Sequence, residues 1–168
     1  MGLLLVDLQE RLAPAIAESP VVIDCALALV AAAKQGALPI LATEQYPEGL
    51  GLTAARLRRE LNPDWIIEKI AFGAPREDAF RNALIARGIG EVIVVGMEAH
   101  VCVQQTVLCL LELGYGVSLV GDGVASRAPL NKAVALQRMA AAGARIVQVE
   151  QAVARLRAGA ERESTGQT

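Results

Sequence analysis

The chain has 168 residues, of which 54% are hydrophobic and 20% are charged, values typical of one globular domain with a sizeable core. The formal net charge of −2 provides no basic field for nucleic acid or an anionic membrane, so neither is expected as a partner. No apolar run reaches the roughly 18 residues that span a bilayer, and the first residues lack the basic region and cleavage site of a signal peptide.

The cysteines also indicate a cellular compartment. Cys25, Cys102 and Cys109 are odd in number and contain no CxxC pair. This argues against a disulfide framework and against a cysteine-based zinc site. We therefore expect a protein of the reducing cytoplasm.

Strand and helix patterns alternate from the start of the chain. The all-apolar run at residues 3–6 ends on Asp7, as expected of a buried parallel strand. Residues 9–35 follow a helical pattern interrupted at Ser19-Pro20, a capping serine before a first-turn proline. The next expected elements are a strand at 38–43, a loop at 44–51, a helix at 53–61 and a strand at 65–69.

The second half of the chain continues the alternation. The expected elements are a helix at 76–87, a strand at 91–95, a helix at 101–113, a strand at 116–120, a helix at 129–142, a strand at 144–149 and a helix at 150–158. The polar tail at 159–168 is expected to be disordered, so the domain is predicted to span 1–158. Six strand patterns separated by helices predict an α/β fold, a three-layer sandwich with helices on both faces of a parallel sheet.

Ligands of such folds bind beyond the carboxyl ends of the strands. The residues at these ends are Asp7, Thr43-Glu44, Lys69, the segment 97–102 and Asp122. An acid, an ammonium group and the thiol of Cys102 are therefore expected at one rim of the sheet.

Each of these residues has another interpretation when it is taken alone. Asp7 and Asp122 can cap a helix or a turn, Lys69 can be a solvated charge, and Cys102 can be a small buried apolar residue, as Cys25 and Cys109 are expected to be. Three independent placements at one edge favour a joint role for Asp7, Lys69 and Cys102.

The combination suits nucleophilic chemistry. Cys102 lies where the expected helix 101–113 begins, and the free N–H groups of a helix start, together with a nearby Lys69, favour a thiolate. Asp7 is then best placed as a general base that later donates the proton to the leaving group. Backbone N–H groups of the turn at 97–102 are candidates to bind an oxyanion.

Four segments resemble the isochorismatase-like cysteine hydrolases. They are LLLVDLQ near the start, TEQYPEGLG at 43–51, EKIAFGA at 68–74 and VVGMEAHVCVQQT at 94–106. The resemblance covers about residues 3–150 and is greatest to the isochorismatase domain-containing branch.

The resemblance implies further properties. It implies a Rossmann-like, six-stranded parallel sheet of order 3-2-1-4-5-6 and a triad of Asp7, Lys69 and Cys102. It also implies a cis peptide bond between Met97 and Glu98, with the N–H groups of Glu98 and Cys102 as oxyanion donors. A small-molecule substrate and a homo-oligomer, either a dimer or a tetramer, are expected on the same basis.

Two departures from the family's patterns narrow the expected activity. Nicotinamidase relatives carry an aspartate and two histidines after strand 2, whereas this chain has Glu44, Gln45 and Tyr46 there, so no metal and no cofactor are expected. Isochorismatases proper lack the cysteine, so Cys102 indicates acyl chemistry on an amide or related C–N bond. Glu98 replaces a threonine of several amidase branches and is expected to alter substrate choice.

Other residues near the expected rim remain open between two roles. His100, two residues before Cys102, is either a structural or pocket-lining residue or a second base. Glu44, Tyr46 and Phe72 are candidate pocket residues, although packing explains each equally well; Thr106 either bonds local backbone or packs. A second hypothesis is that the protein keeps the fold but turns over nothing, and acts as a redox-responsive or partner-binding protein.

Overall fold

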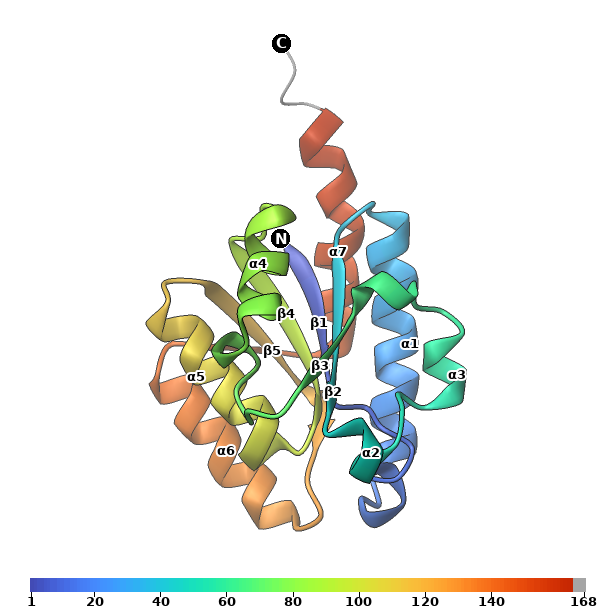
Figure 1. Cartoon of the computed structure of the whole chain (residues 1–168). Coiled ribbons are helices and arrows are strands. Elements are labelled where there is room, and N and C mark those ends of the chain that lie inside the picture. The colour runs from blue at the N-terminus through green and yellow to red at the C-terminus, as the bar shows by residue number, and fades with distance from the viewer. Residues whose placement is uncertain (165–168) are drawn as a thin grey trace.

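Six parallel strands form one sheet in the computed structural model, which describes the backbone of residues 1–164 and the side chains of residues 1–159 (Figure 1). The strands are β1 (Gly2–Val6), β2 (Ile40–Gln45), β3 (Ile66–Lys69), β4 (Glu91–Met97), β5 (Gly116–Ala125) and β6 (Arg145–Val147). Their order is β3-β2-β1-β4-β5-β6. The predicted α/β class and the strand order implied by the resemblance are both confirmed.

Helices cover the two faces of the sheet. The helices are α1 (Ser19–Gln35), α2 (Pro47–Leu50), α3 (Ala55–Arg58), α4 (Asp78–Ala86), α5 (Gln104–Glu112), α6 (Pro129–Ala141) and α7 (Val149–Ser164). In Figure 1, α1, α3 and α7 lie on one side of the strands, and α4, α5 and α6 lie on the other. Among the residues that the structure describes, no helix is both long enough and apolar enough to cross a membrane.

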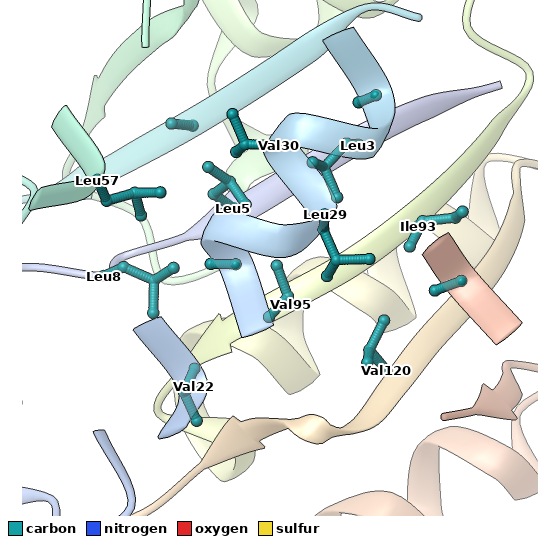
Figure 2. Close-up of a cluster of buried hydrophobic side chains, with 14 of the residues drawn as sticks. Leu3, Leu5, Leu8, Val22, Leu29, Val30, Leu57, Ile93, Val95 and Val120 are labelled. Carbon is teal, nitrogen blue, oxygen red and sulfur yellow. The ribbon is translucent and has the colours of Figure 1, made fainter. Parts of the chain in front are cut away.

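The alternation of side chains along the strands creates two cores. On β1, Leu3 and Leu5 face the layer of α1 and α7, whereas Leu4 and Val6 face the layer of α4, α5 and α6. Figure 2 shows the first of these cores, where side chains of α1 meet those of three neighbouring strands. Burial of both faces explains why the two central strands, β1 and β4, are almost continuously apolar.

A glycine brings the two central strands close together near the carboxyl edge. A Cβ atom at Gly96 of β4 would lie 2.2 Å from the backbone oxygen of Val6 in β1, a distance that no real Cβ contact allows. The close approach places the turn after β4 beside the residue that follows β1. This positioning matters because the turn carries Cys102 and β1 is followed by Asp7.

Many element boundaries differ from those expected, and three of the differences affect the site or the last helix. Strand β2 extends two residues further and includes Glu44 and Gln45, and β5 runs through Asp122 to Ala125 after a register shift. Helix α7 continues to Ser164, so the predicted helix end at residue 158 was wrong, and the start of the supposed disordered tail is helical. The remainder of that tail, 165–168, lies outside the described residues.

Candidate active site

Asp7 follows β1 in a backbone conformation that is uncommon for a residue with a side chain. Its φ is +51°, in the left-handed region, which aspartate and asparagine tolerate better than most residues. The carboxylate is fully buried, and its Oδ1 accepts a hydrogen bond of 2.7 Å from the hydroxyl of Thr43 on β2. Thr43 thereby fixes one oxygen of the acid.

Lys69 ends β3 and crosses over β2 to reach Asp7. Its Nζ lies 2.8 Å from Oδ2 of Asp7, and neither side chain is exposed. The same Nζ donates to Oε1 of Gln45 at 2.6 Å and approaches the carbonyl oxygens of Ala71 at 3.3 Å and Phe72 at 3.2 Å. A buried ion pair needs such additional partners, because burial removes each charge from water.

The second carboxylate oxygen of Asp7 is left without a directed donor. Oδ2 is the buried side-chain nitrogen or oxygen atom that lacks a hydrogen-bond partner within the described residues. The 2.8 Å contact with Lys69 is thus an ionic contact whose angles do not suit a hydrogen bond. Oδ2 is thus compensated by the charge of Lys69, and its remaining lone pair is available to accept a proton.

Cys102 lies in a π-helical turn, Ala99–Val103, that precedes α5. Its Sγ is 3.9 Å from Oε1 of Gln45, and the residue is buried. The pKa of the thiol is raised to about 12, first by burial and then by the negative charge of Asp7, while the ammonium of Lys69 opposes both. This direction is opposite to the expected shift toward a thiolate, because desolvation outweighs the ammonium of Lys69.

Gln45 is a site residue that was not predicted as such. Its Oε1 accepts from Lys69 and faces the thiol of Cys102, and its Nε2 donates to the carbonyl of Ile70 at 2.7 Å. The side chain of Gln9 holds it in place by accepting from the Gln45 backbone N–H at 2.8 Å and donating to its carbonyl at 2.9 Å. The site thus brings together four polar side chains, which we call the polar group at the thiol. They are Asp7 after β1, Gln45 of β2, Lys69 of β3 and Cys102 after β4.

The peptide bond between Met97 and Glu98 is cis. The carbonyl of Glu98 accepts from the N–H groups of Val101 and Val103, which shapes the turn that carries Cys102. The Glu98 carboxylate is buried, and its Oε1 forms an ion pair with Nη2 of Arg127 at 2.8 Å. The role of the Glu98 and Cys102 N–H groups as oxyanion donors stays a prediction.

His100 contacts the connection between β5 and α6. Its Nδ1 lies 2.9 Å from Oγ of Ser126, and the same nitrogen is 3.9 Å from Oε2 of Glu98. A Ser-His-acid relay requires the serine and the acid on opposite ring nitrogens, and here they share one. The contacts favour the structural interpretation of His100 over the second-base interpretation.

Glu44 points away from the thiol. It is buried, and its Oε1 accepts from the N–H and hydroxyl of Thr53, both at 2.7 Å, and from Arg58 at 2.5 Å. Successive residues of a strand face opposite sides, so Glu44 turns to this clamp while Gln45 turns to Lys69. Glu44 thereby holds the segment after β2, and its expected role in the substrate pocket stays a prediction.

This clamp leads to a stability prediction. Glu44→Ala should lower the free energy of unfolding by about 2–3 kcal/mol, because it leaves buried donors unpaired. The matched control is Glu60→Ala, which removes an exposed pair with Lys34 at 2.9 Å and should cost less than about 1 kcal/mol. Urea unfolding of both variants measures the difference, and equal losses would contradict the clamp.

Two aromatic residues flank Lys69 at the rim. Tyr46 is 49% exposed and Phe72 is 57% exposed. The backbone N–H of Tyr46 donates to the carbonyl of Lys69 at 2.9 Å, and the carbonyl of Phe72 faces the ammonium. Both residues are thus exposed beside Lys69, and their role in a substrate pocket remains a prediction.

The remaining predicted residues have structural contacts. The hydroxyl of Thr106 accepts a hydrogen bond of 3.0 Å from the backbone N–H of Ala74, which holds the loop after β3. Asp122 accepts from the N–H of Val149 at 3.0 Å, at the start of α7, in agreement with a capping role. Cys25 and Cys109 are only partly buried, so their expected placement in the core was wrong.

Comparison with known proteins places these features in a family. A model described as the Isochorismatase domain matches residues 1–151. Isochorismatase domain-containing protein 1 of Salmo salar is 35% identical over 144 residues, and the alignment covers 82% of this chain but only 48% of that protein. The chain thus spans about half the length of that relative.

Two solved structures extend the likeness to the fold. The MAR1 ribonuclease of Caenorhabditis elegans is 34% identical, with a TM-score of 0.86, over 99% of this chain and 89% of that chain. YcaC of Pseudomonas aeruginosa, solved with hexane-2,5-diol and covalent acrylamide, is 27% identical, with a TM-score of 0.85, over 96% of this chain and 80% of that chain. With the domain match over residues 1–151, these findings show that the chain belongs to the isochorismatase family.

Proposed function

We propose that this chain is a metal-independent cysteine hydrolase of a small amide or related C–N bond. Its catalytic residues are Asp7, Lys69 and Cys102. The isochorismatase fold makes hydrolase activity plausible, and the buried polar group at the thiol supports the finer assignment.

The first half of the reaction forms an acyl-enzyme. The Cys102 thiol gives its proton to Oδ2 of Asp7 while the sulfur attacks the substrate carbonyl carbon. The resulting oxyanion is bound by the N–H groups of Glu98 and Cys102. Protonated Asp7 then donates to the nitrogen, the C–N bond breaks and the amine leaves.

The second half returns the enzyme to its starting state. Asp7 takes a proton from water as the water oxygen attacks the thioester carbon. The C–S bond breaks, the carboxylic acid leaves, and the proton returns to the sulfur. Lys69 keeps the Asp7 carboxylate oriented throughout and balances its charge in the buried site.

One observation carries this proposal. Oδ2 of Asp7 is a buried carboxylate oxygen that contacts the Lys69 ammonium but has no directed hydrogen bond among the described residues, and the adjacent thiol has a pKa raised to about 12. At neutral pH such a thiol holds its proton. Reaction therefore requires a base beside it, and Oδ2 of Asp7 is suited to that task.

The descriptions of two relatives suggest two kinds of compound to test. Acrylamide, found covalently bound in the Pseudomonas structure, is a small amide with an electrophilic carbon and is a suitable probe for Cys102. The Caenorhabditis protein is named a ribonuclease, but a formal net charge of −2 does not favour a polyanion here. Small amides are therefore the preferred substrates, with RNA as the comparison.

The test is a panel of small amides, with release of ammonia or amine as the measurement and RNA cleavage assayed in parallel. Cys102→Ala should lower the best amide activity by about 10³-fold or more. Cys109→Ala, which removes a partly buried thiol outside the polar group, should leave it within about twofold.

Other outcomes would favour other functions. Amine release that survives Cys102→Ala would end the cysteine mechanism. A silent amide panel with ready oxidation of Cys102 by mild peroxide would favour the redox-responsive interpretation. RNA cleavage lost in Cys102→Ala, with no amide cleaved, would favour a nuclease.

We also propose that the protein forms a homo-oligomer in the cytoplasm. Large apolar side chains are exposed at several places, among them Ile70 at 70% and Leu130 at 74%, and their burial between copies would be favourable. Three free cysteines suit a reducing compartment. Light scattering of the purified protein gives the oligomer size.

A further inference from the structure

Gln45 joins two of the proposed catalytic residues through one oxygen atom. Its Oε1 accepts a hydrogen bond of 2.6 Å from Nζ of Lys69 and lies 3.9 Å from Sγ of Cys102, close enough to accept the thiol proton. The residue ends β2 and is buried, with 8% of its surface exposed. Its amide has no part in the reaction steps given to Asp7, Lys69 and Cys102, yet it contacts both the ammonium and the thiol.

The partners of Gln45 leave one orientation for its amide. An ammonium group can only donate a hydrogen bond, and a backbone carbonyl can only accept one. Oε1 must therefore face Lys69, and Nε2 must face the carbonyl of Ile70, to which it donates at 2.7 Å. Rotation of the amide by half a turn would set a donor against the ammonium and an acceptor against the carbonyl, so both hydrogen bonds would be lost.

The backbone of residue 45 is fixed as well. The fully buried side chain of Gln9 accepts from the N–H of Gln45 at 2.8 Å and donates to its carbonyl at 2.9 Å. The register of β2 and β3 pairs Gln45 with Lys69. Because backbone and amide are both held, Oε1 of Gln45 is a fixed acceptor in the polar group at the thiol.

Two acceptors compete for the single proton of the Cys102 thiol. Burial, then the negative charge of Asp7 and a hydrogen bond to it, raise the pKa of the thiol to about 12, so Asp7 lies within reach of the proton. Gln45 is the second acceptor. An amide oxygen has almost no basicity, so Gln45 can orient the S–H bond but cannot remove the proton.

We propose that Gln45 is a positioning residue, whose Oε1 holds the Lys69 ammonium beside Asp7 and orients the S–H group of resting Cys102. During attack the S–H group turns about the Cβ–Sγ bond, the proton passes to Oδ2 of Asp7, and the sulfur bonds to the substrate carbon. Gln45 itself neither gains nor loses a proton. The role rests on the proposed function for the reaction that it serves, and alkylation of Cys102 by acrylamide measures it without a substrate.

The neutral amide also keeps the charges of the site in balance. The site holds one negative group, Asp7, and one positive group, Lys69, which lie 2.8 Å apart. Two other carboxylates of this region bind elsewhere, that of Glu44 in the clamp after β2 and that of Glu77 at the N–H of Ile70, 3.1 Å away. A second carboxylate at residue 45 would compete with Asp7 for the ammonium.

Gln45→Met tests the role of the amide oxygen. The substitution keeps an unbranched side chain but supplies neither acceptor nor donor, so Cys102 alkylation should fall by about 10–100-fold, and kcat for an amide should fall more than KM changes. Gln104→Met is the matched control. Gln104 is also 8% exposed, but among residues 1–159 its side chain forms no hydrogen bond with the polar group at the thiol. Its alkylation rate should stay within about twofold of the wild-type rate.

Gln45→Glu provides a rescue that depends on pH. A protonated carboxyl reproduces both contacts, because its carbonyl oxygen accepts from Lys69 and its O–H donates to the carbonyl of Ile70. Burial and Asp7 would raise the pKa of a carboxyl at this position, and Lys69 would lower it. The alkylation rate relative to wild type should be within about threefold near pH 5 and should fall at least about tenfold by pH 8, as the carboxyl ionises and adds a negative charge beside the thiol.

Peptide mass spectrometry follows the alkylation of Cys102 in each variant, and urea unfolding gives its stability. A wild-type alkylation rate in Gln45→Met, with only a lower urea midpoint, would make Gln45 a structural residue and overturn the proposal. A Gln45→Glu rate that stays constant or rises with pH relative to wild type would also overturn it, even if Gln45→Met does not fold. Neither result would remove the proposed function, which fails if amide hydrolysis survives Cys102→Ala.

Discussion

Asp7→Asn is expected to lower amide hydrolysis and Cys102 alkylation at neutral pH by about 10³–10⁴-fold. The thiol has a pKa raised to about 12, so it is protonated unless a base removes the proton during attack. Among the described residues Oδ2 of Asp7 has an ionic contact with Lys69 but no directed hydrogen bond, and the asparagine amide replaces a carboxylate by a group with no useful basicity. Both rates are measured at saturating and limiting substrate or probe.

Asparagine is the suitable replacement because it preserves the geometry around residue 7. It tolerates the left-handed φ of +51° and can keep a hydrogen bond with Thr43. The control is Thr43→Val, which removes the 2.7 Å hydrogen bond to Oδ1 but leaves Oδ2 in place, and it should cost less than about tenfold. A loss below tenfold in Asp7→Asn would assign the proton to another group.

The pH dependence of the Cys102 alkylation rate should differ between Asp7→Asn and the wild type. In Asp7→Asn the remaining reaction depends on the ionised thiol, whose fraction rises about tenfold for each pH unit below its pKa. The variant's alkylation rate should therefore rise steeply with pH through neutrality and beyond. The wild-type rate should be much flatter over the same range, because Asp7 accepts the proton.

Lys69→Met is expected to lower the free energy of unfolding by about 3–5 kcal/mol, as well as the activity. The substitution leaves the Asp7 carboxylate buried, without the ammonium that lies 2.8 Å away, and removes the hydrogen bond to Gln45. It also removes the charge that opposes the raised pKa of Cys102, so that pKa should rise further. Urea unfolding and acrylamide alkylation measure the two effects separately.

The double variant Asp7→Asn with Lys69→Met separates stability from chemistry. Removing both charges eliminates the uncompensated buried carboxylate, so the double variant should be more stable than Lys69→Met by about 2 kcal/mol. Activity should not return, because the base is absent. Stability losses that simply add in the double variant would show that the two groups do not form a coupled pair.

The sequence predicted which charged residues meet at the edge of the sheet better than it predicted their contacts and the protonation state of the thiol. Asp7 and Lys69 stand at the ends of apolar strands, and parallel strands bring such ends to one rim, so their meeting could be expected. The strand order itself came from the resemblance to the family, because local periodicity does not encode which strands are neighbours.

Gln45 was missed because the boundary of β2 was placed two residues early. Glu44 and Gln45 are polar and precede Pro47, so they fit a loop pattern. In the structure they continue the strand, and the alternation of a strand sends Glu44 to Thr53 and Gln45 to Lys69. The pairing of Gln9 with the backbone of Gln45 joins residues 36 apart and leaves no local signal.

The protonation state of Cys102 was also beyond local inference. A cysteine at an apparent helix start suggests a thiolate, but a π-helical turn precedes α5 and the sulfur is buried beside a carboxylate. Burial is a property of the packed molecule, and here it is the largest cause of the raised pKa.

The central claim is that the sulfur of Cys102 becomes covalently bound to the acyl part of the substrate while Asp7 holds the proton. It is tested most directly by acid-quenching the reaction of the best amide and locating the added mass by peptide mass spectrometry. The account predicts an acyl adduct on the peptide that contains Cys102, with no adduct in Cys102→Ala. Amine release without any adduct on Cys102, or an adduct on another residue that Cys102→Ala does not abolish, would contradict it.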